Sequence, residues 1–104
     1  MSERVFVVSE WLPKKNCEEQ LWIFLNTIMT LTENEKGCVR AHAYRPTNLP
    51  ESPVKSKYPF MLLQEYIDIQ AFEAHCQEEH TKNAFEQQVP LLVEEWTCRI
   101  LQDL

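Results

Sequence analysis

Two features of this 104-residue chain predict an α+β fold built on one antiparallel sheet. The first is the order of its hydrophobic patterns, with a long helical stretch after the first strand-like segment and two short helices before the last. The second is that its strand-like segments carry apolar side chains on both faces, which is typical of strands covered on both sides. A chain of this length builds one core, so we expect residues 1–104 to form a single domain.

The N-terminal third is expected to form a strand followed by a long helix. Residues 4–12 are apolar on both faces of an alternating pattern, and Pro13 ends this strand because proline lacks the amide that a sheet needs. Asn16 and Glu19 have the spacing of a capping box, so the helix is expected to begin at Asn16. Two apolar stripes at helical spacing then continue to about Lys36, and their combined width indicates a partner subunit.

The middle of the chain is expected to contain a helix stop, a strand and a stiff loop. Gly37 is the only glycine, and it lies where the end of a helix requires a positive φ. Residues 38–45 are predicted to be the second strand, with small side chains on one face and larger polar or aromatic ones on the other. Residues 46–59 contain four of the six prolines, so we expect an irregular loop.

The second half is expected to contain a strand, two short helices and a last strand. The apolar run at residues 60–67 predicts the third strand, and residues 69–77 a short helix. A further helix is predicted to start near Thr81, a possible N-cap, and to end close to Pro90, which has no amide hydrogen to donate. Residues 96–101 are the predicted fourth strand.

This order of elements, βαββ(αα)β, is the split βαβ arrangement of a ferredoxin-like fold. Such a fold places its helices on one face of an antiparallel sheet and leaves the other face open. The open face is predicted to be apolar here, and large exposed apolar patches mark interfaces. We therefore expect a homodimer in which two sheets press together.

The charge of the chain excludes two classes of partner. Its net charge of −6 argues against nucleic acid, whose phosphates require a basic face, and against an anionic membrane surface. No apolar run approaches the roughly 20 residues of a membrane-spanning helix, and the first residues do not resemble a signal peptide. We expect a soluble, cytoplasmic protein.

Cysteine and histidine spacing predicts neither disulfides nor a metal site. The four cysteines are widely spaced: Cys17, Cys38, Cys76 and Cys98. Without a C-x-x-C pair they are expected to be reduced, mostly buried thiols. Metal ligation is the alternative for His75, Cys76 and His80, but the two histidines are five residues apart, about 140° around a helix. Zinc-binding pairs prefer other spacings, so we expect no metal.

Four short motifs carry a resemblance to a known family: Gly37-Cys38, Leu63-Gln64-Glu65-Tyr66, Ala74-His75 and His80-Thr81-Lys82. They resemble the antibiotic biosynthesis monooxygenase-like family, and in particular its small bacterial quinol monooxygenases and a relative that processes a phosphorylated quorum-sensing signal. The resemblance covers nearly the whole chain. It implies a dimeric α+β barrel with a pocket in each subunit between the helices and the sheet.

The sequence departs from the family pattern at two places. The glutamate of the family falls at Gln64, and the carboxylate of Glu65 is one residue later, which in a strand turns it to the opposite face. The Thr-Pro that precedes the second histidine in the family is replaced by Glu78-Glu79. The pocket architecture is therefore predicted more firmly than its chemistry.

Oxygenation without flavin or metal requires a substrate that supplies its own electrons, and a protein that deprotonates it and excludes water. His75 is the candidate base or anion holder, because an imidazole accepts a proton near neutral pH. Tyr66 could donate its hydroxyl to a substrate oxygen. Further candidates for substrate contact share the helix or strand faces next to these two: His80, His42, Phe72 and Gln64.

Each of these residues also has a structural interpretation. His75 could pack its ring and bond a carbonyl group, and His80 could fix the junction between two helices. Tyr66 could be a core aromatic residue whose hydroxyl is satisfied within the protein. Both interpretations remain open from the sequence.

The leading functional hypothesis is a cofactor-independent monooxygenase that uses molecular oxygen to oxidise a small quinol-like or aromatic molecule. One alternative is an isomerase or degradation enzyme for a small phosphorylated signal molecule. Phosphate would then need the positive charge of Lys55, Lys57 and Lys82. The other alternative is a non-catalytic module that binds a small ligand.

Overall fold

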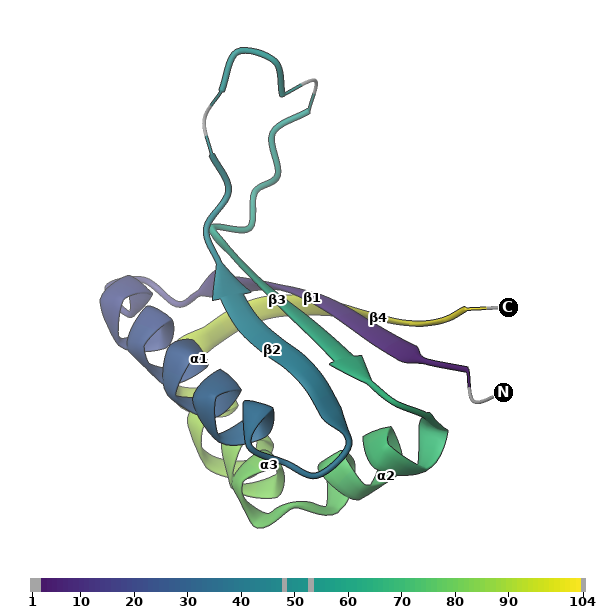
Figure 1. Cartoon of the computed structure of the whole chain (residues 1–104). Helices are drawn as coiled ribbons and strands as arrows, with labels where there is room; N and C mark the ends of the chain where they lie inside the picture. The colour runs from purple at the N-terminus through teal and green to yellow at the C-terminus, as the bar shows by residue number, and fades with distance from the viewer. Residues whose placement is uncertain (1–2, 48, 53, 104) are drawn as a thin grey trace.

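Four antiparallel strands form one sheet in the order β2-β3-β1-β4 (Figure 1). The computed structural model describes residues 3–47, 49–52 and 54–103. The strands are β1 (Val5–Pro13), β2 (Cys38–Tyr44), β3 (Phe60–Tyr66) and β4 (Val93–Gln102). The helical elements are α1 (Glu18–Glu33), α2 (Ile69–Gln77), α3 (Glu79–Asn83), the π-helical turn η1 (Ala84–Gln88) and α4 (Val89–Leu92). This element and strand order confirms the predicted α+β, ferredoxin-like arrangement.

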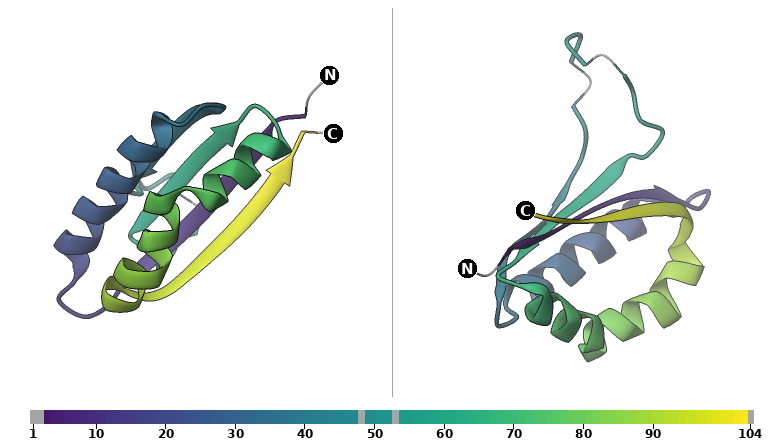
Figure 2. Two further views of the ribbon diagram at one scale, coloured as in Figure 1. Left: turned by 90° about the horizontal axis from the view of Figure 1, so that it is seen from below. Right: turned by 90° about the vertical axis from the view of Figure 1, so that its right-hand side faces the viewer.

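All the helices cover one face of the sheet, and the loop between β2 and β3 extends from the other side (Figure 2). The helix-covered face is built from the alternate residues that the β1 pattern predicts, because Val5, Val7 and Trp11 are buried there. Helix α1 packs on this face through a stripe of buried residues: Leu21, Leu25, Met29 and Thr32. Leu31, near the end of this helix, is 46% exposed.

Both ends of helix α1 differ from the sequence prediction. Asn16 does not cap the helix; it adopts φ 67° in the turn before it, and Cys17 at the N-cap position makes no side-chain capping bond. Asparagine tolerates this left-handed conformation better than most residues. The helix also ends at Glu33 and not near Lys36, because the chain turns through bonds from the Asn34 and Glu35 amides to the carbonyls of residues 31 and 32.

The helical segment after α2 begins earlier than predicted. Helix α3 starts at Glu79 and not at Thr81, and the Thr81 side chain is buried instead of capping the helix. The helix then widens into η1 before Pro90, and β4 follows directly at Val93. Within the described residues, no helix has both the length and the apolar character needed to cross a bilayer.

The outer face of the sheet carries apolar and charged residues together. Phe6, Val8 and Leu63 are half-buried there. Glu65 also lies on this face and forms ion pairs with Arg4 and with Arg40, 3.0 Å away in the second case. Strand alternation predicted that the side chains of Gln64 and Glu65 point to opposite faces. This is observed, since Gln64 lies on the helix-covered face.

Candidate active site

Two small cavities lie on the helix-covered face of the sheet, between the sheet and helices α2 and α3. The Trp96 cavity, about 140 Å³, extends along β1 and β4, and the Phe24 cavity, about 50 Å³, extends toward α1. Five residues line both of them: Trp11, Gln64, His75, Thr81 and Phe85. An apolar cavity of about 150 Å³ holds a benzene ring in another protein, so the space suits one small aromatic ring.

A carboxylate and two imidazoles meet at the wall of these cavities. The Nδ1 atom of His75 lies 3.0 Å from both carboxylate oxygens of Glu35, and the Nε2 atom of His80 lies 2.5 Å from Oε2 of the same residue. The side chains of Glu35 and His75 are only 7% and 10% exposed, and that of His80 is 22% exposed. We refer to this group as the Glu35–His75–His80 cluster.

Gly37 explains why Glu35 reaches the two histidines. Gly37 has φ 91°, and a Cβ atom at this position would lie 2.6 Å from the Cβ of Ala71 in α2. Only glycine meets both demands, since it has no side chain and adopts positive φ without strain. The close approach is fixed by a hydrogen bond from the Ile67 amide to the Gly37 carbonyl, 2.9 Å long. The turn after α1 is therefore held against α2, and Glu35 lies beside His75.

The environment of His75 favours one tautomer of its ring. Because Nδ1 faces a carboxylate, that nitrogen carries the hydrogen and donates it, which leaves the lone pair on Nε2. The ring is flanked by Tyr66 and Phe72, with centroids 5.2 and 6.2 Å away. A basic nitrogen in an aromatic, water-poor wall can accept a proton, and the carboxylate behind it can stabilise the resulting imidazolium.

Tyr66 and Gln64 form a second polar pair in the site. Tyr66 is fully buried, and its hydroxyl donates to the Oε1 atom of Gln64. Burial, with smaller contributions from Cys38 and Glu35, raises the pKa of Tyr66, so the hydroxyl keeps its proton. With Oε1 engaged, the amide NH₂ is the group that Gln64 can offer to a ligand in the cavities.

The two cysteines beside the Trp96 cavity are poor nucleophiles. Burial raises the pKa of both Cys76 and Cys98, and the charges of Glu35 and Glu73 add to the effect at Cys76. Since the thiolate is the reactive form, these thiols are protonated and weakly reactive near neutral pH. All four cysteines are free, as predicted, but the prediction that they are mostly buried is wrong: Cys17 and Cys38 are half-buried, and Cys76 and Cys98 are exposed, with their thiols only partly desolvated.

The predicted site residues fall into three groups. His75, Gln64 and Phe72 line the cavities, whereas Tyr66 lies behind Gln64 and His80 behind Glu35. His42 lies on the outer face of the sheet, with its side chain 62% exposed and 3.6 Å from the carboxylate of Glu33. It is not brought together with the others, because side chains in β2 alternate between faces and the buried Ala41 takes the inward position.

Glu35 was missed by the sequence analysis. The predicted helix extended to Lys36, which made Glu35 one of several surface carboxylates. The signal that could have identified it was its position two residues before the only glycine, whose contact with α2 carries it inward.

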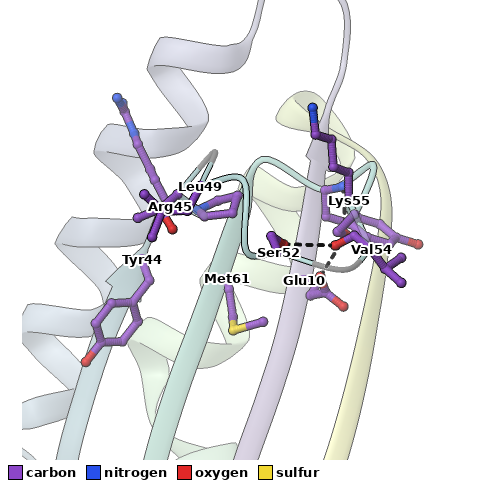
Figure 3. Close-up of a pocket in the computed structure, with 12 residues that line it drawn as sticks. Glu10, Tyr44, Arg45, Leu49, Ser52, Val54, Lys55 and Met61 are labelled. Carbon is purple, nitrogen blue, oxygen red and sulfur yellow. Dashed lines mark hydrogen bonds between the residues drawn. The ribbon is translucent and has the colours of Figure 1, made fainter.

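A wider pocket lies under the proline-rich loop on the outer face (Figure 3). It measures about 270 Å³, and its lining includes Glu10, Tyr44 and Lys55. At the base of this loop, Glu95 accepts hydrogen bonds from Lys57 and Tyr58, which we refer to as the Lys57–Tyr58–Glu95 cluster. Because these polar groups are exposed and far less desolvated than Glu35, the inner cavities are the candidate active site.

Comparison with known proteins gives one family. The antibiotic biosynthesis monooxygenase family matches the chain over residues 4–87, a range that contains all three members of the Glu35–His75–His80 cluster. No curated protein matches the chain.

Many solved structures share the fold. A protein from Shewanella oneidensis is 24% identical, with a TM-score of 0.81 and coverage of 99% of this chain and 93% of that one. A dabb family protein with a ferredoxin-like fold from Mesorhizobium loti is 15% identical, with a TM-score of 0.77 and coverage of 99% of both chains. A dimeric protein of unknown function from Bacteroides fragilis, also ferredoxin-like, is 11% identical, with a TM-score of 0.70 and coverage of 96% of both.

Proposed function

This chain belongs to the antibiotic biosynthesis monooxygenase family, and on that basis we propose that it oxidises a small quinol-like or aromatic molecule with molecular oxygen. The proposal includes no flavin or metal, because a quinol supplies the electrons itself. One observation carries it: the Nδ1 atom of His75 is held by a buried carboxylate while the ring borders a cavity of about 140 Å³. A base held in one tautomer beside a small, mostly apolar cavity suits proton abstraction from a phenol.

The proposed reaction begins when Nε2 of His75 takes a proton from a hydroxyl of the bound quinol. Glu35 stabilises the imidazolium that forms, and the amide NH₂ of Gln64 can donate to the anionic oxygen. The electron-rich anion then reduces O₂. One oxygen atom enters the ring and the other leaves as water, so a quinol and O₂ give a hydroxyquinone and water.

In this proposal the predicted site residues take different parts, and the role of Tyr66 changes from the predicted one. His75 is the base, Gln64 contacts the substrate oxygen, and Phe72 supplies an aromatic wall. Tyr66 orients Gln64 by donating to its Oε1 atom, and His80 holds Glu35 in place. His42 would contribute from the outer face, and only through a partner subunit.

We also propose that the protein is a homodimer that joins its subunits through the outer sheet face. Apolar side chains such as Phe6, Val8 and Leu63 lie on this face beside charged groups, and a structural neighbour from Bacteroides fragilis is dimeric. Light scattering after size exclusion tests this directly, and a mass of one 12.4 kDa chain would contradict it. The predicted cytoplasmic location remains a prediction.

Oxygen uptake with a panel of benzoquinols and naphthoquinols tests the oxygenase proposal. His75→Ala should lower kcat by about 100-fold or more, in the range that general bases contribute. The matched control is Gln77→Ala, an exposed position in the same helix, which should turn over normally. Mass spectrometry with ¹⁸O₂ should place one labelled oxygen atom in the product.

Two results would contradict the oxygenase. One is unchanged turnover in His75→Ala, and the other is a quinol that binds and raises the melting temperature without any oxygen uptake. The second result would favour the non-catalytic binding module. The phosphorylated-signal alternative gains no support, since Lys55 lines the outer pocket, Lys57 is paired with Glu95, and Lys82 is exposed and lines neither inner cavity.

A further inference from the structure

We propose that the Glu35–His75–His80 cluster is a binding site for a divalent first-row metal ion such as Zn²⁺, and that metal and substrate chemistry compete for it. One carboxylate and two imidazoles are a ligand set that zinc and ferrous iron both accept. The three ligand atoms, one from each residue, all lie within 4.8 Å of one another. The inference that metal binds does not depend on the proposed oxygenase; the inference that it inhibits does.

The separations between these atoms are close to those of a metal site. Bonds of about 2.1 Å at 90–109° place neighbouring ligand atoms about 3.0–3.4 Å apart. The distance from His75 Nδ1 to Glu35 is 3.0 Å, and that from His80 Nε2 is 2.5 Å, so these two pairs need to move by only some tenths of an ångström. The two imidazole nitrogens lie within 4.8 Å of each other, so they need to approach by up to about 1.5 Å to bind one ion. The three ligands come from the α1–β2 turn, α2 and α3, and Gly37 already holds the first two of these elements together.

The charge of the cluster also favours the binding of a metal cation. Glu35 is nearly buried, and within the described part of the chain its ion pairs are with the two histidines alone. A buried carboxylate without a lysine or arginine partner is stabilised by any cation that enters beside it.

Metal binding is incompatible with the base role of His75. A metal on Nδ1 moves the ring hydrogen to Nε2, which is the nitrogen that would otherwise accept the substrate proton. It also withdraws the Glu35 carboxylate from the ring. Occupancy by zinc should therefore stop quinol oxidation without blocking the cavity itself.

Competition with a chromophoric chelator tests binding without any activity measurement. The chelator-treated wild-type protein should take up one equivalent of Zn²⁺, and histidine NMR signals of residues 75 and 80 should shift while that of His42 does not. Glu35→Gln and His80→Ala should each weaken zinc binding by more than the roughly 10–100-fold that loss of an outer hydrogen bond costs. His42→Ala controls for histidine outside the cluster, and a Cys76→Ser/Cys98→Ser variant for zinc held by thiols; both should bind as the wild type does.

The outcomes separate this proposal from the oxygenase. No zinc uptake, or uptake that survives Glu35→Gln and is lost in the cysteine variant, overturns the metal site and leaves the oxygenase intact. Uptake together with zinc-inhibited turnover supports both. Turnover that appears only after Fe²⁺ is added supports the site, overturns the inhibitory role of the metal and overturns the metal-free oxygenase.

Discussion

Two carboxylates of this protein each accept hydrogen bonds from two side chains, yet they lie in opposite environments. Glu35 faces His75 and His80 with 7% of its side chain exposed, whereas Glu95 faces Lys57 and Tyr58 with 44% exposed. The first lies between the helices and the sheet. The second lies at the base of the loop on the outer face.

The comparison shows that burial, more than the number of partners, decides how strongly a carboxylate affects the side chains that it contacts. An exposed ion pair contributes little because water and salt screen it. A desolvated carboxylate is expensive to leave without partners and therefore fixes their positions and tautomers. We expect the Glu35–His75–His80 cluster to control chemistry and the Lys57–Tyr58–Glu95 cluster to affect only the loop.

The same neutral substitution in both carboxylates tests this contrast directly. Glu35→Gln should lower quinol turnover by about 100-fold or more, because a neutral amide does not stabilise the imidazolium and can turn its NH₂ toward Nδ1, which favours the wrong tautomer of His75. Glu95→Gln should leave the rate unchanged. Steady-state oxygen uptake measures both, and equal rates in the two variants would contradict the assignment of the site.

Gly37→Ala should lower the free energy of unfolding and disturb the Glu35–His75–His80 cluster while leaving the Lys57–Tyr58–Glu95 cluster unchanged. The left-handed φ costs about 1–2 kcal/mol for alanine, and the contact with Ala71 adds roughly 1–3 kcal/mol of overpacking. Urea unfolding should therefore show a loss of about 2–5 kcal/mol. The NMR signals of His75 should change, while those of the loop base should not.

A double variant refines the Gly37 test. Adding Ala71→Gly to Gly37→Ala removes the contact but leaves the φ cost, so part of the stability should return. If Gly37→Ala unfolds like the wild type, the turn does not hold Glu35 in place as inferred here.

The smallest expected effect is that of pH on the Lys57–Tyr58–Glu95 cluster at the base of the proline-rich loop. Hydrogen bonds from Lys57, and then Tyr58, lower the pKa of Glu95 below its ordinary 4.5, so its contribution is present above pH 4.5 and is lost as pH falls through the lowered pKa. The bond to Glu95 raises the pKa of Lys57 and of Tyr58, so their contributions are lost only as pH rises through those raised values.

NMR relaxation of the amides at residues 55–58 measures this effect. Loop motion should increase between pH 6 and pH 3 and also in high salt, which screens exposed charge pairs. Glu95→Gln should be mobile at both pH values. A loop that is equally rigid under all these conditions would show that apolar contacts, and not this cluster, hold its base.

Local patterns in the sequence were enough to predict the elements and their order. Alternation placed Val5 and Val7 on the same face of β1 and placed Gln64 and Glu65 on opposite faces of β3, because successive side chains of a strand point to opposite sides. The two helix ends were less predictable. Asparagine is a favoured N-cap residue, but the turn after β1 gives Asn16 a φ of 67°, and Asn16 does not cap the helix.

The sequence by itself determined the α+β fold, since hydrophobic periodicity is a local property that 7–16 residues are enough to express. The tertiary structure alone decided the site. Glu35 is 40 residues from His75 and 45 from His80, and the one local signal, the glycine two residues later, does not say which residues Glu35 will meet. The contact of Gly37 with Ala71 brings it inward, because a backbone without a side chain can approach a helix where any other residue would collide.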